Sequence, residues 1–157
     1  FKGVLYPGLI ITKDGPKVIE FNARFGDPET QSYMRLLETD LLEIILACVE
    51  GTLDQVDIKW RAESACCVVL ASGGYPGEYQ TGFPITGLDN LDKEVIVFPA
   101  GMEEKDGQIF TTGGRVLGIT ATGHNLQSAL HKAYLAAEQI NFTGKHYRTD
   151  IGKKSLG

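Results

Sequence analysis

The sequence predicts an α+β protein, in which antiparallel strands and helices form separate groups along the chain. Two β-rich runs separated by a tight-turn signal occupy the start, and two apolar helical segments follow before residue 51. Several short strand-like segments then precede a single amphipathic helix near residues 126–140. Runs of strands with few helices between them favour this class over a parallel sheet built from βαβ units.

The first element is a predicted β-hairpin. Residues 3–12 (GVLYPGLIIT) and residues 17–22 (KVIEFN) are both rich in β-branched and apolar residues. Between them lies Lys13-Asp14-Gly15-Pro16, and an Asp-Gly pair supplies the positive φ angles that a tight hairpin turn needs. The two runs are therefore expected to pair antiparallel.

Two helices are predicted next. Asp27 followed by Pro28 matches an N-cap residue with proline at the first helical position, which indicates a short helix over residues 28–37. A second start at Thr39-Asp40 leads into the apolar residues 41–50, which Gly51 ends as a C′ residue. Residues 52–61 lack strong periodicity and are expected to form a connection.

The remainder is predicted to be rich in strands. SACCVVLAS (64–72) is typical of a buried strand, and EVIVF (94–98) is a second one. QIFTT (108–112) and RVLGITA (115–121) flank Gly113-Gly114, which predicts a two-residue hairpin between them.

The last predicted helix begins after Asn125, an N-cap residue, and its apolar residues recur at spacings of three and four up to Ile140. Residues 143–157 are polar, with a possible short strand near His146.

Composition limits the functions that the chain can have. The formal net charge is -5 and the isoelectric point is about 5.2, so no general basic field attracts nucleic acid or anionic lipid. No stretch reaches the roughly 20 apolar residues that span a bilayer. The odd set Cys48, Cys66 and Cys67 suits reduced thiols and a cytoplasmic protein. Because the sequence starts with Phe1 in what reads as a strand, we expect a piece of a longer protein.

The polar segment that follows the hairpin carries the candidate chemistry. Glu20 and Asn22 alternate on a strand and so project from one face. A carboxylate beside an amide carbonyl offers hard oxygen ligands of the kind that Mg²⁺ prefers. Arg24 adds a planar cation suited to phosphate, and the helix start beyond Asp27 offers free amides to an anion. In most proteins, however, a Glu and an Asn alternating on a strand are simply its solvated face. Asp27 and Glu29 are likewise compatible with ordinary capping and helix-dipole compensation.

A family resemblance favours the functional interpretation. EFNARFGDPETQ (20–31), preceded by GVLYPGLIITKDGPKVI (3–19), strongly resembles the glycinamide ribonucleotide synthetase family of ATP-grasp enzymes. The similarity continues in the family's order through GGYPGEY (73–79), GGRVLGITATG (113–123) and YRTDIG (147–152). It therefore covers nearly the whole chain, and the run NARFGDPET is its most specific part.

The resemblance implies an activity and a division of the chain. Residues 1–60 would be the C-terminal portion of an ATP-grasp domain with its metal site, and residues 61–157 a small β-rich domain resembling a barrel-sandwich hybrid. The reaction implied is the ATP-dependent ligation of glycine to 5-phosphoribosylamine, through glycyl phosphate, in purine biosynthesis. The partners implied are these small molecules and the missing N-terminal portion of the same enzyme, with neither nucleic acid nor membrane.

The resemblance also implies roles for individual residues. Glu20 and Asn22 match the family's ligands for Mg²⁺ (or Mn²⁺), and Arg24 matches an arginine near the transferring phosphate of ATP. Three further residues are expected to bind substrate or phosphate: Asp27, Glu29 and Arg115. For Arg115 the alternative is a structural one, an exposed residue that follows the Gly113-Gly114 turn.

Two expectations limit this interpretation. Many ATP-grasp enzymes carry another acidic ligand on the preceding strand, but residues 3–12 contain no acid. Any further metal ligands must come from elsewhere, and the chain alone is expected to be inactive. Two alternatives remain: another ATP-grasp enzyme that activates a carboxylate, and a non-catalytic binding module.

Overall fold

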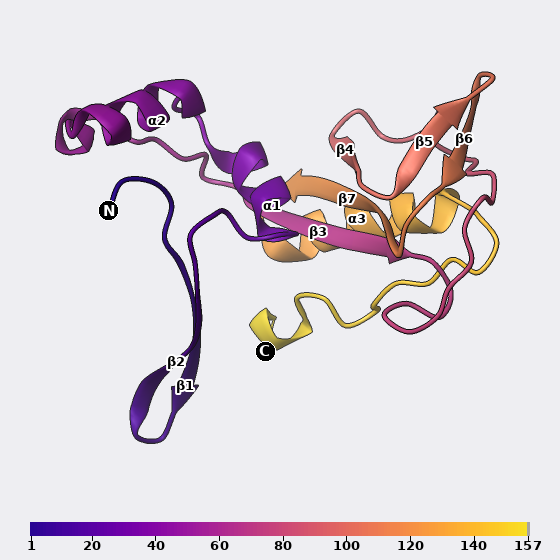
Figure 1. The fold of residues 1–157 in the computed structure, drawn as a ribbon, viewed down its shortest axis with the longest axis horizontal. Coiled ribbons are helices and arrows are strands. Elements are labelled where there is room, and N and C mark those ends of the chain that lie inside the picture. Colours follow the sequence, from indigo (N-terminus) through magenta and orange to yellow (C-terminus); the bar gives the residue numbers. More distant parts are fainter. Residues whose placement is uncertain (157) are drawn as a thin grey trace. The chain divides into compact units, whose positions relative to one another are not determined.

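The computed structural model describes residues 1–156. Its elements follow one another in this order: β1 (Tyr6–Thr12), β2 (Gly15–Asn22), α1 (Glu29–Leu36), α2 (Leu41–Glu50), η1 (Leu53–Gln55), β3 (Ser64–Ala71), β4 (Val95–Pro99), β5 (Met102–Lys105), β6 (Gln108–Thr111), β7 (Arg115–Gly123), α3 (Leu126–Gln139) and η2 (Lys153–Ser155). Helices and antiparallel strands are grouped along the chain (Figure 1), so the predicted α+β class is confirmed. Among the described residues, no helix combines the length and apolar character that crossing a membrane requires.

The contacts divide the chain into two units. The hairpin unit contains Phe1–Thr30 and Leu37–Arg61, and the β-rich unit contains Gln31–Leu36 and the chain from Ala62 onward. Helix α1 contributes its first two residues to the hairpin unit and its other six to the β-rich unit.

In the hairpin unit, β1 and β2 form a two-stranded antiparallel sheet, as the sequence predicts (Figure 1). The turn consists of Lys13 and Asp14, because Thr12 already pairs with Gly15. A positive φ angle occurs at Gly15 (96°) but not at Asp14, so only the glycine of the Asp-Gly pair is needed for the left-handed conformation.

The two helices that follow the hairpin differ in how well they were predicted. Helix α2 begins at the predicted N-cap, where the Asp40 side chain accepts a hydrogen bond from Leu42 N at 2.8 Å, and it ends at left-handed Gly51. Helix α1 begins at Glu29, so the prediction that Pro28 occupies its first position is wrong. Pro28 lies in the turn before the helix, after a cis peptide bond.

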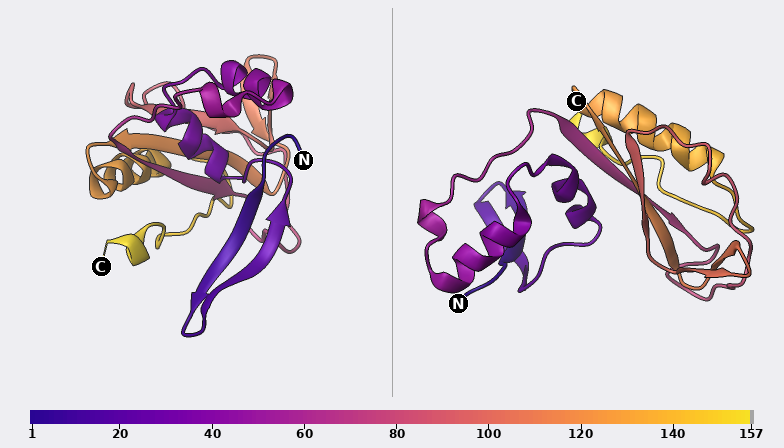
Figure 2. Two further views of the ribbon diagram at one scale, coloured as in Figure 1. Left: turned by 90° about the vertical axis from the view of Figure 1, so that its left-hand side faces the viewer. Right: turned by 90° about the horizontal axis from the view of Figure 1, so that it is seen from above.

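The β-rich unit is built on a three-stranded antiparallel sheet with the order β3-β7-β4. Helix α3 lies beside this sheet (Figure 2). Strand β7 is central, and its residues 116–123 are all buried. Alternate residues of β3 (Cys66, Val68 and Leu70) are buried in the core with α3, and Ala71 is buried beyond the irregularity at Leu70/Ala71. Cys66 is therefore inside, whereas its neighbour Cys67 is half-buried on the other face.

Helix α3 covers one face of this sheet. Asn125 caps it as predicted, because the Asn125 side chain accepts a hydrogen bond from Ser128 N at 2.9 Å. Small residues on its inner face let the helix lie close to β3 and β7, and they are joined in the core by larger apolar side chains. The core residues contributed by the helix are Ala129, Leu130, Ala133, Ala136 and Ala137.

The predicted hairpin at Gly113-Gly114 is wrong. Strand β6 pairs with β5, and β7 pairs with β3 and β4, so the two glycines connect different sheets. Neither glycine has a positive φ angle. They are required instead for close approach: a Cβ on Gly113 would lie 3.0 Å from Gly101 Cα, and one on Gly114 would lie 2.2 Å from the ring of Tyr75.

The true hairpin turn is Asp106-Gly107, between β5 and β6. Both residues have positive φ angles, 52° and 76°, which is the pattern of a type I′ turn. Strand β5 was not expected from the sequence, because its residues Met-Glu-Glu-Lys are mostly charged and exposed.

The polar segment that follows α3 is hydrogen-bonded to that helix. Tyr134 Oη donates a hydrogen bond to Arg148 O (2.9 Å) and accepts one from Ile151 N (3.1 Å), and burial raises the pKa of this tyrosine. Arg148 and Asp150 form a bidentate pair, and the hydrogen bonds between them raise the pKa of Arg148 and lower that of Asp150. Lys145 Nζ donates to carbonyls at the end of α3, and burial lowers its pKa.

Candidate metal and phosphate site

The structure brings Glu20 and Asn22 together at the open end of the β1–β2 hairpin, away from its turn. They lie two residues apart on β2, and Asn22 Nδ2 donates a hydrogen bond to Glu20 Oε1 at 3.0 Å. The same amide group lies 3.5 Å from Tyr6 O on the paired strand. With the amide nitrogen engaged in this way, the Asn22 carbonyl oxygen and the Glu20 carboxylate remain as oxygen ligands on one face of the strand.

Gly8 provides the space for the Glu20 side chain. Gly8 pairs directly with Glu20 across the hairpin, and a Cβ added there would lie 3.2 Å from Glu20 Cγ. The pairing register shifts immediately beyond this pair, at Gly8/Leu9. The irregularity therefore precedes Glu20, and the alternation that aligns it with Asn22 is kept.

Arg24 follows the strand on an exposed turn. Its Nη1 donates a hydrogen bond to the carbonyl oxygen of Phe25 at 2.9 Å, so the guanidinium group folds back against the local backbone. This leaves a permanent cation close in sequence to the Glu20–Asn22 pair, at the surface of the hairpin unit.

Gly26 allows Glu29 to fold over the same loop. Gly26 is buried, and a Cβ added there would lie 2.4 Å from Glu29 Oε2 and 2.9 Å from Tyr6 Cε1. Thr30 N donates to Gly26 O at 3.0 Å, and Thr30 Oγ1 donates to the same oxygen. The first turn of α1 is thus hydrogen-bonded to Gly26, and the Glu29 carboxylate and the Tyr6 ring both occupy the space where a side chain at Gly26 would lie.

The remaining predicted site residues are Asp27 and Arg115. Asp27 is exposed in the turn before α1. Arg115 is an exposed residue at the start of β7, and its carbonyl oxygen accepts a hydrogen bond from Gly101 N at 2.9 Å. Arg115 belongs to the β-rich unit, whereas the other five candidates belong to the hairpin unit.

The donor set fits a hard divalent cation but does not complete its coordination. Mg²⁺ takes oxygen ligands and keeps several waters, so one carboxylate and one carboxamide oxygen are suitable protein ligands. Among residues 1–156, no group of three or more His, Cys, Asp or Glu side chains is placed to hold a metal. A metal at Glu20 and Asn22 would therefore need further oxygens from water, nucleotide phosphates or other parts of the protein.

Sequence reasoning missed three residues that shape this site. Tyr6 and Gly8 on β1 face Asn22 and Glu20 across the hairpin, and Gly26 accommodates Glu29. The signal was present in Pro7-Gly8, an interruption in an otherwise β-rich run. It could have indicated a close approach or a bulge, but not which side chain would fill the space.

Comparison with solved structures defines the class of the fold. The biotin carboxylase domain of 2-oxoglutarate carboxylase from Hydrogenobacter thermophilus aligns with a TM-score of 0.59 at 15% identity, covering 88% of this chain and 31% of that chain. Residues 1–30 match the ATP-grasp (A) domain of phosphoribosylglycinamide synthetase. Together these likenesses identify a part of the ATP-grasp class of folds.

The family follows from a longer match. Residues 65–154, more than half of the chain, match the C domain of phosphoribosylglycinamide synthetase. The chain belongs to the phosphoribosylglycinamide synthetase family, as the resemblance of its motifs implies.

Individual relatives agree with this assignment. Phosphoribosylamine–glycine ligase of Caldanaerobacter subterraneus is 55% identical over 151 residues, which cover 96% of this chain and 36% of the relative. The ligase of the same name from Synechocystis is 50% identical over 159 residues, covering 99% of this chain and 38% of the relative. The crystal structure of the Thermotoga maritima ligase aligns with a TM-score of 0.80 at 39% identity, covering 93% of this chain and 36% of that chain. The chain therefore spans little more than a third of the length of these relatives.

Proposed function

We propose that this chain is the C-terminal part of an enzyme that ligates glycine to 5-phosphoribosylamine at the expense of ATP, a step of purine biosynthesis. The observation that carries the proposal is the Glu20–Asn22 pair on β2, in which Asn22 Nδ2 lies 3.0 Å from Glu20 Oε1. The pair occurs in a chain that is similar over nearly its whole length to phosphoribosylamine–glycine ligases. The chemistry of the site agrees with this activity. The oxygens of Glu20 and Asn22 suit a metal ion, and Arg24 suits the phosphates of a nucleotide.

The proposed reaction has two steps. A carboxylate oxygen of glycine attacks the γ-phosphorus of ATP, which releases ADP and forms glycyl phosphate. The amine of 5-phosphoribosylamine then attacks the acyl carbon, phosphate leaves, and the nitrogen loses a proton as the amide forms. Activation is required because a free carboxylate is a poor electrophile, whereas the acyl phosphate is a mixed anhydride from which phosphate can leave.

The residues of the hairpin unit are assigned to the first step. Glu20 and Asn22 would hold Mg²⁺ (or Mn²⁺), which supplies charge neutralisation on the ATP phosphates. Arg24 is assigned to the transferring phosphoryl group, because its planar guanidinium can donate two parallel hydrogen bonds to phosphate oxygens. In this structure Nη1 donates to the Phe25 carbonyl, and the Nε and Nη2 groups provide further donors.

Three further residues are assigned to substrate binding. Asp27 and Glu29 are acidic and suit the amino or hydroxyl groups of the substrates better than their phosphates. Arg115, an exposed cation at the start of β7, suits the phosphate of phosphoribosylamine. We also propose that residues 1–60 complete an ATP-grasp domain and that residues 61–157 form the C domain of a cytoplasmic enzyme.

The test uses the full-length protein that contains this chain. The double variant Glu20→Gln/Asn22→Leu keeps the shapes of both side chains nearly unchanged while removing a charge and an amide oxygen. We expect the ATP- and glycine-dependent ligase rate to fall by at least about 100-fold, because charge neutralisation at the transferring phosphate is lost. Raising the Mg²⁺ concentration should restore part of the rate.

Matched controls separate the proposal from its alternatives. The double variant Glu103→Gln/Asn90→Leu changes two exposed residues of the β-rich unit and should keep the full rate. If the wild-type protein used bicarbonate in place of glycine, another ATP-grasp enzyme would be indicated. A binding module without catalysis would be indicated if the Glu20/Asn22 variant bound ATP and Mg²⁺ as tightly as the wild type does.

A further inference from the structure

Gly113 and Gly114 lie between β6 and β7 and lead directly into Arg115, the residue proposed above to bind the phosphate of phosphoribosylamine. A connection that contains two consecutive glycines is flexible by itself, because neither residue has a side chain that restricts its backbone. The direction in which the Arg115 side chain leaves the main chain therefore depends on the contacts that hold these two glycines.

Ser72, which follows β3, holds the carbonyl groups of both glycines. Its Oγ donates a hydrogen bond to Gly113 O, and its main-chain N donates one to Gly114 O, both at 2.8 Å. Ser72 is only 1% exposed, so its hydroxyl and its amide are removed from water and depend on these two acceptors. One residue thus fixes two consecutive peptide groups immediately before Arg115.

The ring of Tyr75 packs against the same connection. A Cβ added to Gly114 would lie 2.2 Å from Tyr75 Cδ2 and 2.7 Å from Tyr75 Cε2, so the ring fills the space beside the Gly114 backbone. Tyr75 is itself held: its N donates to Ser72 O at 3.1 Å, and its ring makes an edge contact with the ring of Tyr79 at a centroid distance of 6.0 Å. Both tyrosines belong to the motif GGYPGEY (73–79), to which the proposed function assigns no role.

Gly101, which follows β4, holds the connection from the other side. Its N donates a hydrogen bond to Arg115 O at 2.9 Å, and its O accepts one from Thr112 N at 2.8 Å. A Cβ added to Gly113 would lie 3.0 Å from Gly101 Cα. Because β3 and β4 flank β7, the main chain of residues 112–115 is fixed on both sides.

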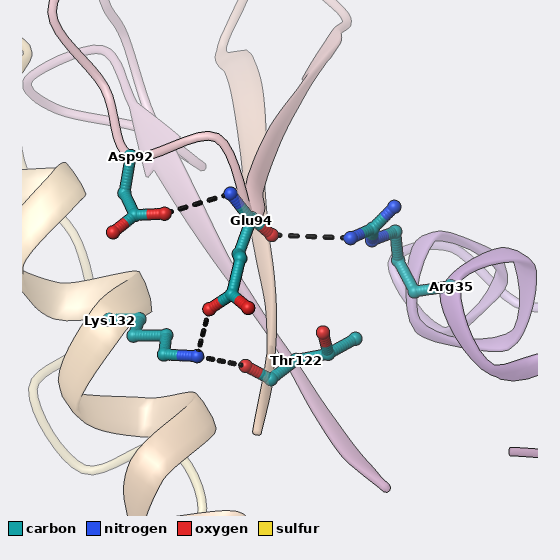
Figure 3. Close-up of polar contacts among 5 residues, drawn as sticks. All are labelled: Arg35, Asp92, Glu94, Thr122 and Lys132. Carbon is teal, nitrogen blue, oxygen red and sulfur yellow. Dashed lines mark hydrogen bonds and ion pairs between the residues drawn. The ribbon is translucent and has the colours of Figure 1, made fainter. Parts of the chain in front are cut away.

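The far end of β7 is fixed by a separate set of contacts. Lys132 Nζ on α3 donates to Thr122 O at 3.1 Å and contacts the carboxylate of Glu94, the residue before β4 (Figure 3). Arg115 therefore lies at the start of a strand that is paired on both edges and held at both ends. Loss of the Lys132 contacts would weaken the same strand without removing any contact of residues 112–115.

We infer that Ser72 and Tyr75 are positioning residues for Arg115: they hold the Gly113-Gly114 connection rigid and thereby limit the positions that the guanidinium group can take before phosphoribosylamine binds. The inference rests on the phosphate-binding role proposed above for Arg115. All the residues that carry it belong to the β-rich unit, and neither Ser72 nor Tyr75 is assigned a contact with substrate. A cation on an ordered backbone loses less conformational freedom when it binds phosphate, so the effect belongs to substrate binding.

The test measures steady-state ligation by the full-length protein, with 5-phosphoribosylamine, ATP and glycine varied in turn. Arg115→Ala should raise the KM for phosphoribosylamine by at least about 20-fold, since charge-assisted hydrogen bonds to the phosphate are lost. Ser72→Ala and Tyr75→Ala should each raise the same KM by about 3- to 10-fold, while the KM for ATP and that for glycine stay within about twofold. Tyr75→Phe keeps the ring beside Gly114 and should behave as the wild type.

A double variant shows whether Ser72 acts through Arg115. The KM of Ser72→Ala/Arg115→Ala for phosphoribosylamine should equal that of Arg115→Ala alone, because the side chain that Ser72 positions is already missing. A further rise in the double variant, by the factor that Ser72→Ala gives alone, would mean that the two residues act independently and would overturn the inference.

Two variants control for lost stability and for a lost hydroxyl. Lys132→Met weakens the far end of β7, and Thr86→Ala removes an exposed hydroxyl that donates to Asn141 O at 3.4 Å. Both should keep the wild-type KM for phosphoribosylamine, and circular dichroism gives the folded fraction of every variant. A rise in Lys132→Met equal to that in Ser72→Ala would mean that the KM follows general loosening of the strand, which contradicts the inference.

The remaining outcomes separate the inference from the proposed function. A raised KM in Arg115→Ala together with wild-type values in Ser72→Ala and Tyr75→Ala refutes the inference and leaves the proposed function standing. An unchanged KM in Arg115→Ala refutes the role proposed for that residue, and the inference with it. If Ser72→Ala does not fold, the Tyr75 variants decide: a raised KM in Tyr75→Ala alone supports the inference, and equal values in Tyr75→Ala and Tyr75→Phe refute it. A wild-type protein without ligase activity would refute the proposed function itself.

Discussion

Gly26 lies beneath the carboxylate of Glu29 and beside the ring of Tyr6, and this packing leads to a prediction about activity. Its φ angle is not in the left-handed region, so alanine is conformationally acceptable there, but the added Cβ would lie 2.4 Å from Glu29 Oε2. Gly26→Ala should therefore displace Glu29 and lower the ligase kcat/KM of the full-length protein by about 10- to 100-fold.

Gly77→Ala provides a comparison, because its added Cβ would make one contact, at 3.2 Å from Gly74 O. Steady-state kinetics of both variants would check the prediction. Equal rates in Gly26→Ala and wild type would show that the position of Glu29 does not matter to the reaction.

Cys66 gives a prediction about pH. Burial of the thiol, with a smaller effect of neighbouring Cys67, raises the pKa of Cys66 from 9.0 to about 11. Between these values the folded protein binds more protons than the unfolded chain, so the free energy of unfolding falls as pH rises. The stabilisation is complete below pH 9 and is lost as the pH passes through about 11.

The change Cys66→Ala isolates this effect. The variant should be less stable by about 1 kcal/mol at pH 8 because a buried sulfur is lost, but its stability should fall less steeply between pH 9 and 11. Urea unfolding at several pH values measures both quantities. In the wild type at pH 8, alkylation should modify Cys66 more slowly than Cys48, which is less buried; comparable rates would contradict the burial of Cys66.

At the scale of secondary-structure elements, β7 and the β1–β2 hairpin differ sharply in their surroundings. Strand β7 is paired on both edges and its residues 116–123 are buried. The hairpin has one pairing only, and several of its apolar side chains are exposed, including Ile11 (79%), Ile19 (69%) and Phe21 (68%). A lone two-stranded hairpin is only marginally stable in water.

Hydrogen–deuterium exchange of the 157-residue chain should therefore separate these two elements. Amides of β7 should exchange only on global unfolding, whereas those of residues 6–22 should exchange through local opening at almost no cost in free energy. Peptides from the two regions, resolved by mass spectrometry, give the comparison directly. Equal protection in both regions would mean that the hairpin is stabilised by contacts beyond its own pairing.

Local signals predicted the elements well and the pairings less well. The caps at Asp40 and Asn125, the left-handed Gly51 and the turn before Gly15 were all readable from residue type, because each depends on a conformation or hydrogen bond within a few residues. The pairing of β6 was assigned wrongly because Gly113-Gly114 resembles a hairpin turn. Gly113 is required because it lies close to Gly101, and Gly114 because it lies close to the ring of Tyr75. Both contacts join residues that are distant in sequence, so no local pattern reveals them.

The same distinction applies to the candidate site. Alternation along a strand was enough to predict that Glu20 and Asn22 share a face, since period-two geometry is local. The contributions of Tyr6 and Gly8 depend on the register of the hairpin, which pairs residues of two different strands. Such long-range contacts require the folded structure.

At the scale of the whole molecule, the candidate metal site is made by two side chains of the hairpin unit. Within residues 1–156, Glu20 and Asn22 lie together on β2, and no group of three or more His, Cys, Asp or Glu side chains could hold a metal ion. The helix α2 also exposes apolar side chains that a working enzyme would be expected to cover, among them Leu42 (61%) and Val49 (59%). The relatives that catalyse the ligation are nearly three times as long.

We therefore predict that the purified 157-residue chain shows no ATP- and glycine-dependent ligation, because two ligands on a marginal hairpin cannot hold ATP and Mg²⁺ in a reactive arrangement. Isothermal titration should likewise detect no ATP binding at submillimolar concentrations, and coupled detection of ADP should show no more than the background rate. The full-length protein assayed in parallel is the positive control. A ligase rate in the isolated chain that disappears in Glu20→Gln/Asn22→Leu would show that the site is complete without the rest of the protein, and the assignment of further ligands elsewhere would then have to be abandoned.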